Sequence, residues 1–301
     1  MEEELIEEQS EDKSEHIKFS VLMSVYHKEK PEFFDKALDS VYNQTVKADE
    51  WVIVKDGPIS RELQDVIDKY KQYDAVNIKE VCLEENKGLG IALSVGVPEC
   101  GNELIARMDT DDIAVPNRFE MQIREFEEDP ELDICGGHIA EFEDDPDTII
   151  AERIVPIAHE EIVEYQKTRS AFNHMTVMYK KSKVLEAGNY KDCPLMEDDM
   201  LWVDMILSGA KCKNIDEYLC RVRTDRNMIA RRGGLKYYKK YKRARKQILA
   251  TGFITKKQYR KTNRIQLLVC LMPKWLRKKV FFGLLHKRNR RKHDRNTSKI
   301  A

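Results

Sequence analysis

Residues 19–58 read FSVLMSVYHKEKPEFFDKALDSVYNQTVKADEWVIVKDGP, and their pattern of apolar residues decides the fold class. The first seven residues are mostly apolar and predict a buried strand. Pro31 then opens a segment whose apolar residues fall at helical spacing. A second apolar run over 51–54 predicts another strand, which ends at the turn signal DGP of residues 56–58. Strand, helix and strand in this order predict a βαβ unit with parallel strands.

The alternation of strands and helices continues along the next fifty residues. Apolar periodicity predicts a second helix that ends near Tyr70, a third strand over 76–83, a short helix within 85–97 and a fourth strand over 103–108. This order indicates an α/β fold, with a mostly parallel Rossmann-like sheet that carries helices on both faces.

Three acids follow the fourth strand, in the segment ELIARMDTDDIAVP of residues 103–116. Ligands of parallel sheets bind beyond the carboxyl ends of the strands, so we expect Tyr26, Asp56 and these acids on one rim. Because side chains alternate along an extended chain, Asp109 and Asp111 point to the same side. Two such carboxylates can hold Mg²⁺ or Mn²⁺ together with water and phosphate oxygens. A polar turn before a helix explains the same acids equally well.

Two further positions admit both a functional and a structural interpretation. Lys87, Gly88 and Gly90 lie before a helix without the spacing of a Walker loop or a dinucleotide fingerprint. They either bring a ligand close to the backbone or only allow the chain to enter the helix. His174 begins a predicted strand over 171–180, and an isolated histidine of this kind is either structural or a phosphate neighbour.

A second acidic group, Glu197, Asp198 and Asp199, precedes an amphipathic helix over 200–207. Acids at a helix start are favourable without any function, but one of them can also act as a general base. A group of arginines before Gly233 and Gly234 either clamps a diphosphate or forms a solvated basic face. These arginines are Arg221, Arg223, Arg226, Arg231 and Arg232.

The charges are distributed unevenly along the chain. Residues 231–301 hold 25 Lys and Arg and one acid, a charge of +24, so the first 230 residues carry −25 in a chain of net charge −1. Grouped aliphatic residues and Trp275 interleave with the basic residues, which favours a helix on an anionic membrane surface. Nucleic-acid binding is the competing interpretation, but bases would stack on exposed aromatic residues, so we expect no nucleic-acid partner.

Cysteine usage and the apolar runs bear on the cellular location. The seven cysteines are scattered without a C-x-x-C pair, which is typical of reduced thiols in a cytosolic chain. Residues 1–16 are rich in Glu and lack the apolar segment of a signal peptide. Because no apolar run approaches the roughly 20 residues of a spanning helix, we expect a cytoplasmic protein bound peripherally to the inner face of the cell membrane.

Six segments resemble, in their order and spacing, the motifs of glycosyltransferase family 2, especially bacterial capsule and polysaccharide transferases. They start with residues 19–45 and continue with VKDGP, NKGLG, ARMDTDDI, NHMTVMYKKS and MEDDMLWVDMILSGAK. Lys55 and Pro58 stand where many members have Asp and Ser, as in a subgroup that also reads VKDGP. The resemblance spans about residues 19–234 and implies a glycosyltransferase A fold, a nucleotide-sugar donor, Mn²⁺ or Mg²⁺, and inversion at the anomeric carbon.

The resemblance also implies roles for single residues. Asp109 and Asp111 match the ribose and metal positions of the family's D-x-D motif, and Asp198, next to Glu197, matches the catalytic base. The implied nucleotide contacts are Ser24, Val25, Tyr26, Asp56, Lys87 and Asp109. The implied contacts to the donor phosphates or the acceptor are His174, Glu197, Arg231 and Arg232.

These features together predict three parts and one activity. The parts are a disordered acidic lead-in over 1–16, a catalytic domain over 17–234 and a basic helical tail over 235–301. Within the catalytic domain we expect a nucleotide-sugar half up to about residue 115 and an acceptor half after it. The predicted activity is inverting, metal-dependent hexosyl transfer from a UDP-sugar to a glycan or lipid-linked acceptor in capsule or other surface polysaccharide synthesis.

Two alternatives stay open at this point. A sugar nucleotidyltransferase has a related sheet but needs a glycine-rich basic loop after the first strand, where this chain reads SVYHKEK. A non-catalytic protein that binds nucleotide-sugars would keep the donor site and recruit partners through the basic tail.

Overall fold

The first half of the chain folds as alternating strands and helices in the computed structural model, which describes residues 17–73, 76–224 and 233–277. These elements are β1 (Phe19–Val25), α1 (Pro31–Tyr42), β2 (Glu50–Lys55), α2 (Arg61–Lys71), β3 (Ile78–Cys82), α3 (Leu89–Glu99) and β4 (Leu104–Arg107). Strand β1 lies between β2 and β4, parallel to both, and β3 pairs parallel to β2. The predicted parallel α/β arrangement is confirmed for this half of the chain.

The second half extends the sheet with strands of mixed direction. Its elements are β5 (Ile113–Ala114), α4 (Arg118–Glu128), β6 (Leu132–Phe142), β7 (Ile149–Arg153), α5 (His159–Gln166), the 3₁₀ turn η1 (His174–Thr176), β8 (Met178–Lys180), α6 (Lys181–Glu186), α7 (Glu197–Leu207) and β9 (Lys211–Arg223). Strand β8 pairs antiparallel with both β4 and β6, whereas β9 runs parallel to β6. The described sheet has nine strands in the order β3-β2-β1-β4-β8-β6-β9-β5, with β7 on β6.

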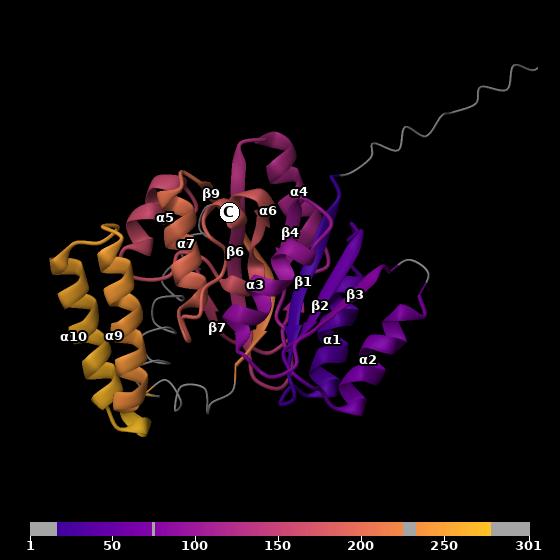
Figure 1. The fold of residues 1–301 in the computed structure, drawn as a ribbon, viewed down its shortest axis with the longest axis horizontal. Coiled ribbons are helices and arrows are strands. Elements are labelled where there is room, and N and C mark those ends of the chain that lie inside the picture. The colour runs from indigo at the N-terminus through magenta and orange to yellow at the C-terminus, as the bar shows by residue number, and fades with distance from the viewer. Residues whose placement is uncertain (1–16, 74–75, 225–232, 278–301) are drawn as a thin grey trace, which may run out of the picture.

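Helices cover both faces of the sheet (Figure 1), because the central strands are apolar on both sides. In β1, Val21 and Met23 join an apolar cluster with α1, α2 and α4. Leu22 points to the opposite face and joins a second cluster with α3, α6 and α7, in which Trp202 is fully buried. Because successive side chains of β1 point to opposite faces of the sheet, this one strand packs against helices on both faces.

The prediction of a single strand over 171–180 is wrong for its first half. The chain forms the turn η1 there, and only β8 is extended. Thr176 explains the difference, because its hydroxyl donates to the carbonyl of Asn173 at 2.8 Å and accepts from the amide of Gly137 at 3.1 Å. These side-chain bonds replace the ladder bonds that a strand would make.

The basic C-terminal region was predicted to be helical, and its described part forms two helices, α9 (Gly234–Ala250) and α10 (Lys256–Leu271). They contact α7 and the loop before it through a buried apolar cluster that includes Met200, Val203, Ala244 and Ile248. Within the described ranges, no helix combines the length and apolar character needed to cross a bilayer. The predicted acidic lead-in over 1–16 lies outside the described residues.

Candidate active site

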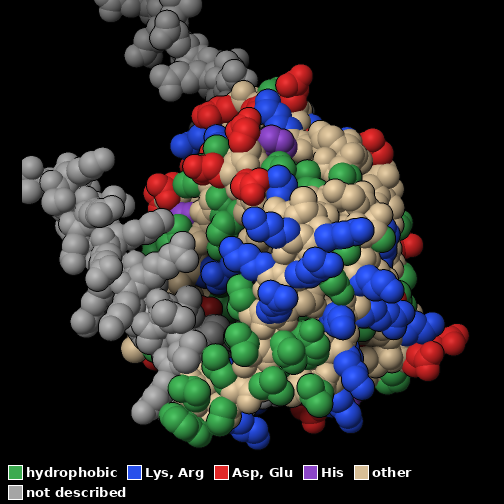
Figure 2. Space-filling model, turned by 90° about the vertical axis from the view of Figure 1, so that its left-hand side faces the viewer, with side chains coloured by type: hydrophobic (Ala, Val, Ile, Leu, Met, Phe, Trp, Pro, Cys, Tyr) green, Lys and Arg blue, Asp and Glu red, His purple; other side chains and the backbone are tan. Residues whose placement is uncertain are grey.

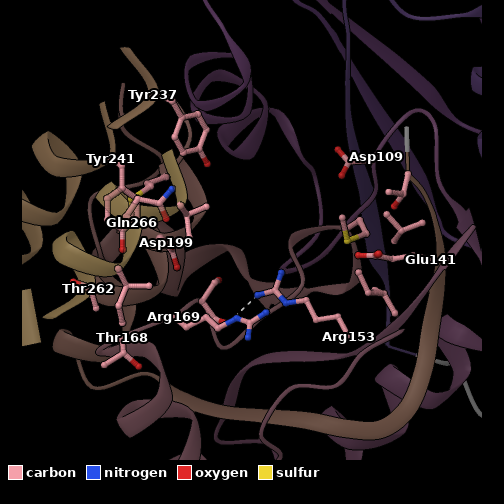
Figure 3. A pocket seen from close by; sticks show the side chains of 18 of the residues that line it. Asp109, Glu141, Arg153, Thr168, Arg169, Asp199, Tyr237, Tyr241, Thr262 and Gln266 are labelled. Atoms are coloured by element: carbon pink, nitrogen blue, oxygen red, sulfur yellow. Dashed lines mark hydrogen bonds between the residues drawn. The ribbon is translucent and has the colours of Figure 1, made fainter. Parts of the chain in front are cut away.

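A cavity of about 960 Å³ opens beyond the carboxyl end of β4 (Figure 3). Asp109, Asp111 and Asp112 line it from the sheet side, where β6, β7 and β9 also contribute. Asp199, in the first turn of α7, lines it from the other side together with residues of α9 and α10. The fold therefore brings together two acidic groups that are far apart in the sequence.

The three acids after β4 lie in different surroundings. Asp109 forms an ion pair with Arg107, whose side chain is 1% exposed. Asp112 is buried, and its carboxylate accepts a hydrogen bond from the backbone amide of Arg223 at 2.9 Å. Asp112 thus ties the loop after β4 to the end of β9. Asp111 receives no such side-chain anchor among the described residues.

A fourth carboxylate, which the sequence analysis did not single out, shares this region. Glu29 lies in the loop after β1, and burial, Asp111 and Asp109 together raise its pKa to about 7. Burial and the neighbouring Asp109 raise the pKa of Asp111 to about 6. Both shifts have the same cause, since several carboxylates crowd a partly buried site with too little positive charge.

These residues fit a divalent cation, on the chemistry of the donor atoms. Hard carboxylate oxygens suit Mg²⁺ and Mn²⁺, which commonly take one or two protein carboxylates and complete their shell with phosphate oxygens and water. In the described part of the chain, no group of three or more His, Cys, Asp and Glu is arranged to hold a metal ion. The arrangement suits a cation that a bound diphosphate helps to hold.

The start of α7 holds the second acidic group. Burial and the neighbouring carboxylates of Asp199 and Glu197 raise the pKa of Asp198 to about 7. Burial also raises the pKa of Glu197, and Arg107 and Asp109 are among the charges that act on it. The first turn of α7 therefore faces the end of β4.

Gly90 allows this close approach. A Cβ atom at this position would lie 2.7 Å from the carbonyl oxygen of Lys191 and 3.1 Å from Cβ of Glu197. The start of α3 thus packs directly against the segment that leads into α7. Close packing within the protein accounts for Gly90, a reason that neither interpretation of this loop in the sequence had included.

Asp56 shapes the loop in front of α3. Its carboxylate accepts hydrogen bonds from the backbone amides of Lys87 at 2.7 Å and Gly88 at 3.0 Å. Gly88 has a φ of +91°, a conformation that favours glycine. Asp56 is 3% exposed. Its predicted contact to a nucleobase stays a prediction, and the structure shows that it also orders the loop carrying Lys87.

The predicted nucleotide contacts at the end of β1 differ in exposure. The side chain of Val25 is fully buried in the core beneath the sheet, so only its backbone is available to a nucleotide. Ser24 and Tyr26 are partly exposed at the predicted rim. Their contacts with a base stay predictions.

His174 lies in a mostly apolar setting. Its Nε2 is 3.0 Å from the hydroxyl of Tyr190, and its ring packs near Trp202. Burial and the positive charge of Arg107 hold its pKa well below the usual range, so the ring is neutral. This environment favours the structural interpretation of His174. Arg226, Arg231 and Arg232 lie outside the described residues.

Other residues that line the cavity escaped the sequence analysis. Arg153 ends β7 and Arg169 follows α5, while Tyr241 and Arg245 come from α9. No local motif marks any of them. Lys261 of α10 also belongs to this set, in a region that the sequence analysis interpreted only as a basic tail.

The amino-acid sequence assigns the chain to a family. The sequence model described as Glycosyl transferase family 2 matches residues 20–186, more than half of the chain. The chain belongs to this family and is a glycosyltransferase. This assignment decides against the nucleotidyltransferase and the non-catalytic binding protein.

Curated relatives agree with the assignment. An uncharacterized glycosyltransferase of Haemophilus influenzae is 42% identical over 73% of this chain and 80% of its own length. The amylovoran biosynthesis glycosyltransferase AmsE of Erwinia amylovora is 39% identical over 78% of this chain and 88% of its own length. An Escherichia coli UDP-Gal:alpha-D-GlcNAc-diphosphoundecaprenol beta-1,3-galactosyltransferase is 39% identical over 73% and 79% of the two chains.

Solved structures show the same fold at low sequence identity. The mannosyltransferase PcManGT of Pyrobaculum calidifontis, in complex with GDP-Man and Mn²⁺, aligns with a TM-score of 0.57 and 13% identity over 84% of this chain and 70% of its own. S. aureus TarS 1-349 in complex with UDP aligns with a TM-score of 0.55 and 15% identity, over 87% and 68% of the two chains. The predicted glycosyltransferase A fold is therefore confirmed.

Proposed function

We propose that this glycosyltransferase transfers a sugar from a UDP-sugar to a lipid-linked acceptor in surface polysaccharide synthesis, with inversion and with a divalent metal. The observation that carries the proposal is the shared cavity of the two acidic groups, with Asp109 and Asp111 on one side and the start of α7 on the other. The name of the Escherichia coli relative supports both the donor and the acceptor class.

Asp198 is the proposed general base. It accepts the proton of the acceptor hydroxyl while that oxygen attacks the anomeric carbon, and the bond from this carbon to the diphosphate breaks. Attack from the face opposite the leaving group inverts the configuration. Its pKa of about 7 suits this role, because a base whose pKa lies near the working pH combines ionisation with proton affinity.

Asp109 and Asp111 are the proposed ligands of Mn²⁺ or Mg²⁺. When bound, such a cation neutralises the negative charge that develops on the departing nucleoside diphosphate. Arg107 orients Asp109 through their ion pair, and Asp56 keeps Lys87 and its loop in place beside the nucleotide. Ser24, Val25 and Tyr26 complete the proposed nucleotide site.

We further propose a peripheral membrane contact through α10. The exposed large apolar side chains on this side of the protein are those of Leu235, Ile265, Leu268, Leu271 and Trp275. Figure 2 shows hydrophobic side chains gathered at the lower end of this face, with a band of Lys and Arg above them. Apolar residues beside basic ones favour an anionic lipid surface.

A transfer assay tests the proposed function. The wild-type protein is incubated with nucleotide-sugars, Mn²⁺ and a synthetic GlcNAc-diphosphate lipid, and the glycosylated product is quantified. Asp198→Asn should lower kcat by roughly 10²- to 10⁴-fold if the residue is a general base. The exposed surface variant Glu164→Gln serves as the control and should keep wild-type activity. Wild-type turnover by Asp198→Asn would contradict the role of Asp198.

A further inference from the structure

The cavity holds positive charges that the proposed mechanism does not use. Arg153, Arg169, Arg245 and Lys261 all line it and come from four different segments. Figure 3 shows the guanidinium groups of Arg153 and Arg169 side by side in the middle of the cavity, with Asp199 on one side and Asp109 and Glu141 on the other. Such a concentration of cations in a concave site attracts anions.

These four cations lack ion-pair partners among the described residues. Arg153 donates from Nη2 to the carbonyl of Ser170 at 2.9 Å, and Arg245 donates to the carbonyl of Lys167. The Nε atoms of Arg153 and Arg245 are both buried without a hydrogen-bond partner in the described chain. A buried charged donor without a partner is unfavourable. The Nε–H groups of Arg153 and Arg245 can therefore donate to an acceptor atom of a ligand.

The nearest carboxylates do not neutralise this group. Asp199 and Asp198 attract Arg153, but no ion pair forms within the described residues, and burial together with the charge of Arg169 lowers the pKa of Arg153. The carboxylate of Asp199 accepts instead from the amide of Gln166 at 2.9 Å. The positive charges of Arg153, Arg169, Arg245 and Lys261 are therefore not neutralised by an ion pair within the described residues.

We propose that Arg153, Arg169, Arg245 and Lys261 form a second phosphate subsite, which binds the diphosphate of the lipid-linked acceptor; this rests on the proposed function. The donor diphosphate belongs at the opposite side, with Asp109 and the cation. The acceptor hydroxyl must reach Asp198, whose charge acts directly on Arg153. A phosphate one sugar ring away from that hydroxyl therefore lies beside the arginines, where guanidinium groups bind phosphate through paired hydrogen bonds.

Helix α10 links this subsite to the apolar surface. Ile265 and Val269 line the cavity, and Ile265, Leu268 and Leu271 are more than half exposed on the same helix. Residues three apart lie on one helical face. The lipid tail of an acceptor held at the arginines would thus leave the cavity along the apolar face of α10, towards the proposed membrane contact.

The test compares two acceptors that carry the same sugar, one as a lipid diphosphate and one as an alkyl glycoside without phosphate. The wild type should prefer the diphosphate. Arg153→Gln and Arg169→Gln should each raise KM for the diphosphate acceptor roughly 10- to 100-fold, while KM for the donor and KM for the alkyl glycoside stay unchanged. Arg169 is exposed, so its variant is informative even if Arg153→Gln fails to fold. Arg124→Gln, an exposed arginine on α4, is the matched control.

Two outcomes would overturn the subsite. One is a wild type that uses both acceptors equally well. The other is a pair of arginine variants that weaken donor binding instead, which would assign the arginines to the donor phosphates. Binding of farnesyl diphosphate, read as thermal stabilisation, tests the subsite without catalysis. If the wild type transfers to no acceptor, the proposed function fails, whereas stabilisation by farnesyl diphosphate that is lost in Arg169→Gln would still support the subsite.

Discussion

The pH dependence of transfer should respond to the charge next to Asp198. Burial beside Asp199 and Glu197 raises the pKa of Asp198 to about 7. A general base acts in its ionised form, so at pH 6 only about a tenth of the enzyme is active and kcat/KM falls about tenfold for each pH unit below that. A carboxylate with an ordinary pKa would stay ionised, and the rate would not change over this range.

Asp199→Asn isolates the electrostatic part of this shift. The substitution removes a like charge but keeps a side-chain oxygen for the hydrogen bond from Gln166, which is 2.9 Å long. The pKa of Asp198 should fall, so the acidic limb of the profile should move to lower pH by roughly one unit. The size of the shift follows from losing one nearby charge while burial is retained.

The assay is kcat/KM between pH 5 and 9 at saturating Mn²⁺, so that metal binding does not shape the profile. Asp65→Asn, which removes a surface charge on α2, is the control and should leave the profile in place. An acidic limb that does not move in Asp199→Asn would refute the electrostatic coupling of these carboxylates. A wild-type profile that is flat from pH 5 to 8 would refute Asp198 as the titrating base.

Three further predictions test other parts of the account. Chelation should abolish activity, and added Mn²⁺ or Mg²⁺ should restore it. The Asp111→Asn variant should need a far higher metal concentration to reach the same rate. Full activity in the presence of chelator would exclude a role for the metal. Gly90→Ala should lower the free energy of unfolding, measured by urea denaturation, by roughly 1–3 kcal/mol and should also lower kcat. The reason is that the new Cβ would lie 3.1 Å from Cβ of Glu197. Unchanged stability and rate would show that the packing at this position is loose. Leu268→Glu should weaken sedimentation with anionic vesicles while activity on a water-soluble acceptor is kept, and unchanged vesicle binding would place the membrane contact elsewhere.

Local patterns were sufficient for the parallel half of the sheet and for the acids on its edge. The apolar run from Phe19 to Val25 can only be buried on both faces, and such strands alternate with helices in one kind of sheet. The rule that ligands bind at the carboxyl ends of strands then predicted the position of Asp109 and Asp111. The structure shows both residues on the cavity.

Residues recruited by tertiary packing could not be predicted in this way. Glu29 has no motif around it, and its pKa of about 7 exists only because Asp111 and Asp109 lie nearby. Arg153 ends an antiparallel strand whose pairing with β6 no local periodicity predicts. The basic residues of α9 and α10 suggested a tail that faces a partner, yet Arg245 is 2% exposed and faces the cavity.

The anomeric configuration of the product tests the central claim most directly. If Asp198 removes the acceptor proton in a single displacement, a UDP-sugar with an α-linked phosphate must give a β-linked product. Proton NMR of the purified product, with the coupling constant of its new anomeric proton, measures this. We predict the β-anomer alone, and an α-linked product would contradict a single displacement with Asp198 as the base.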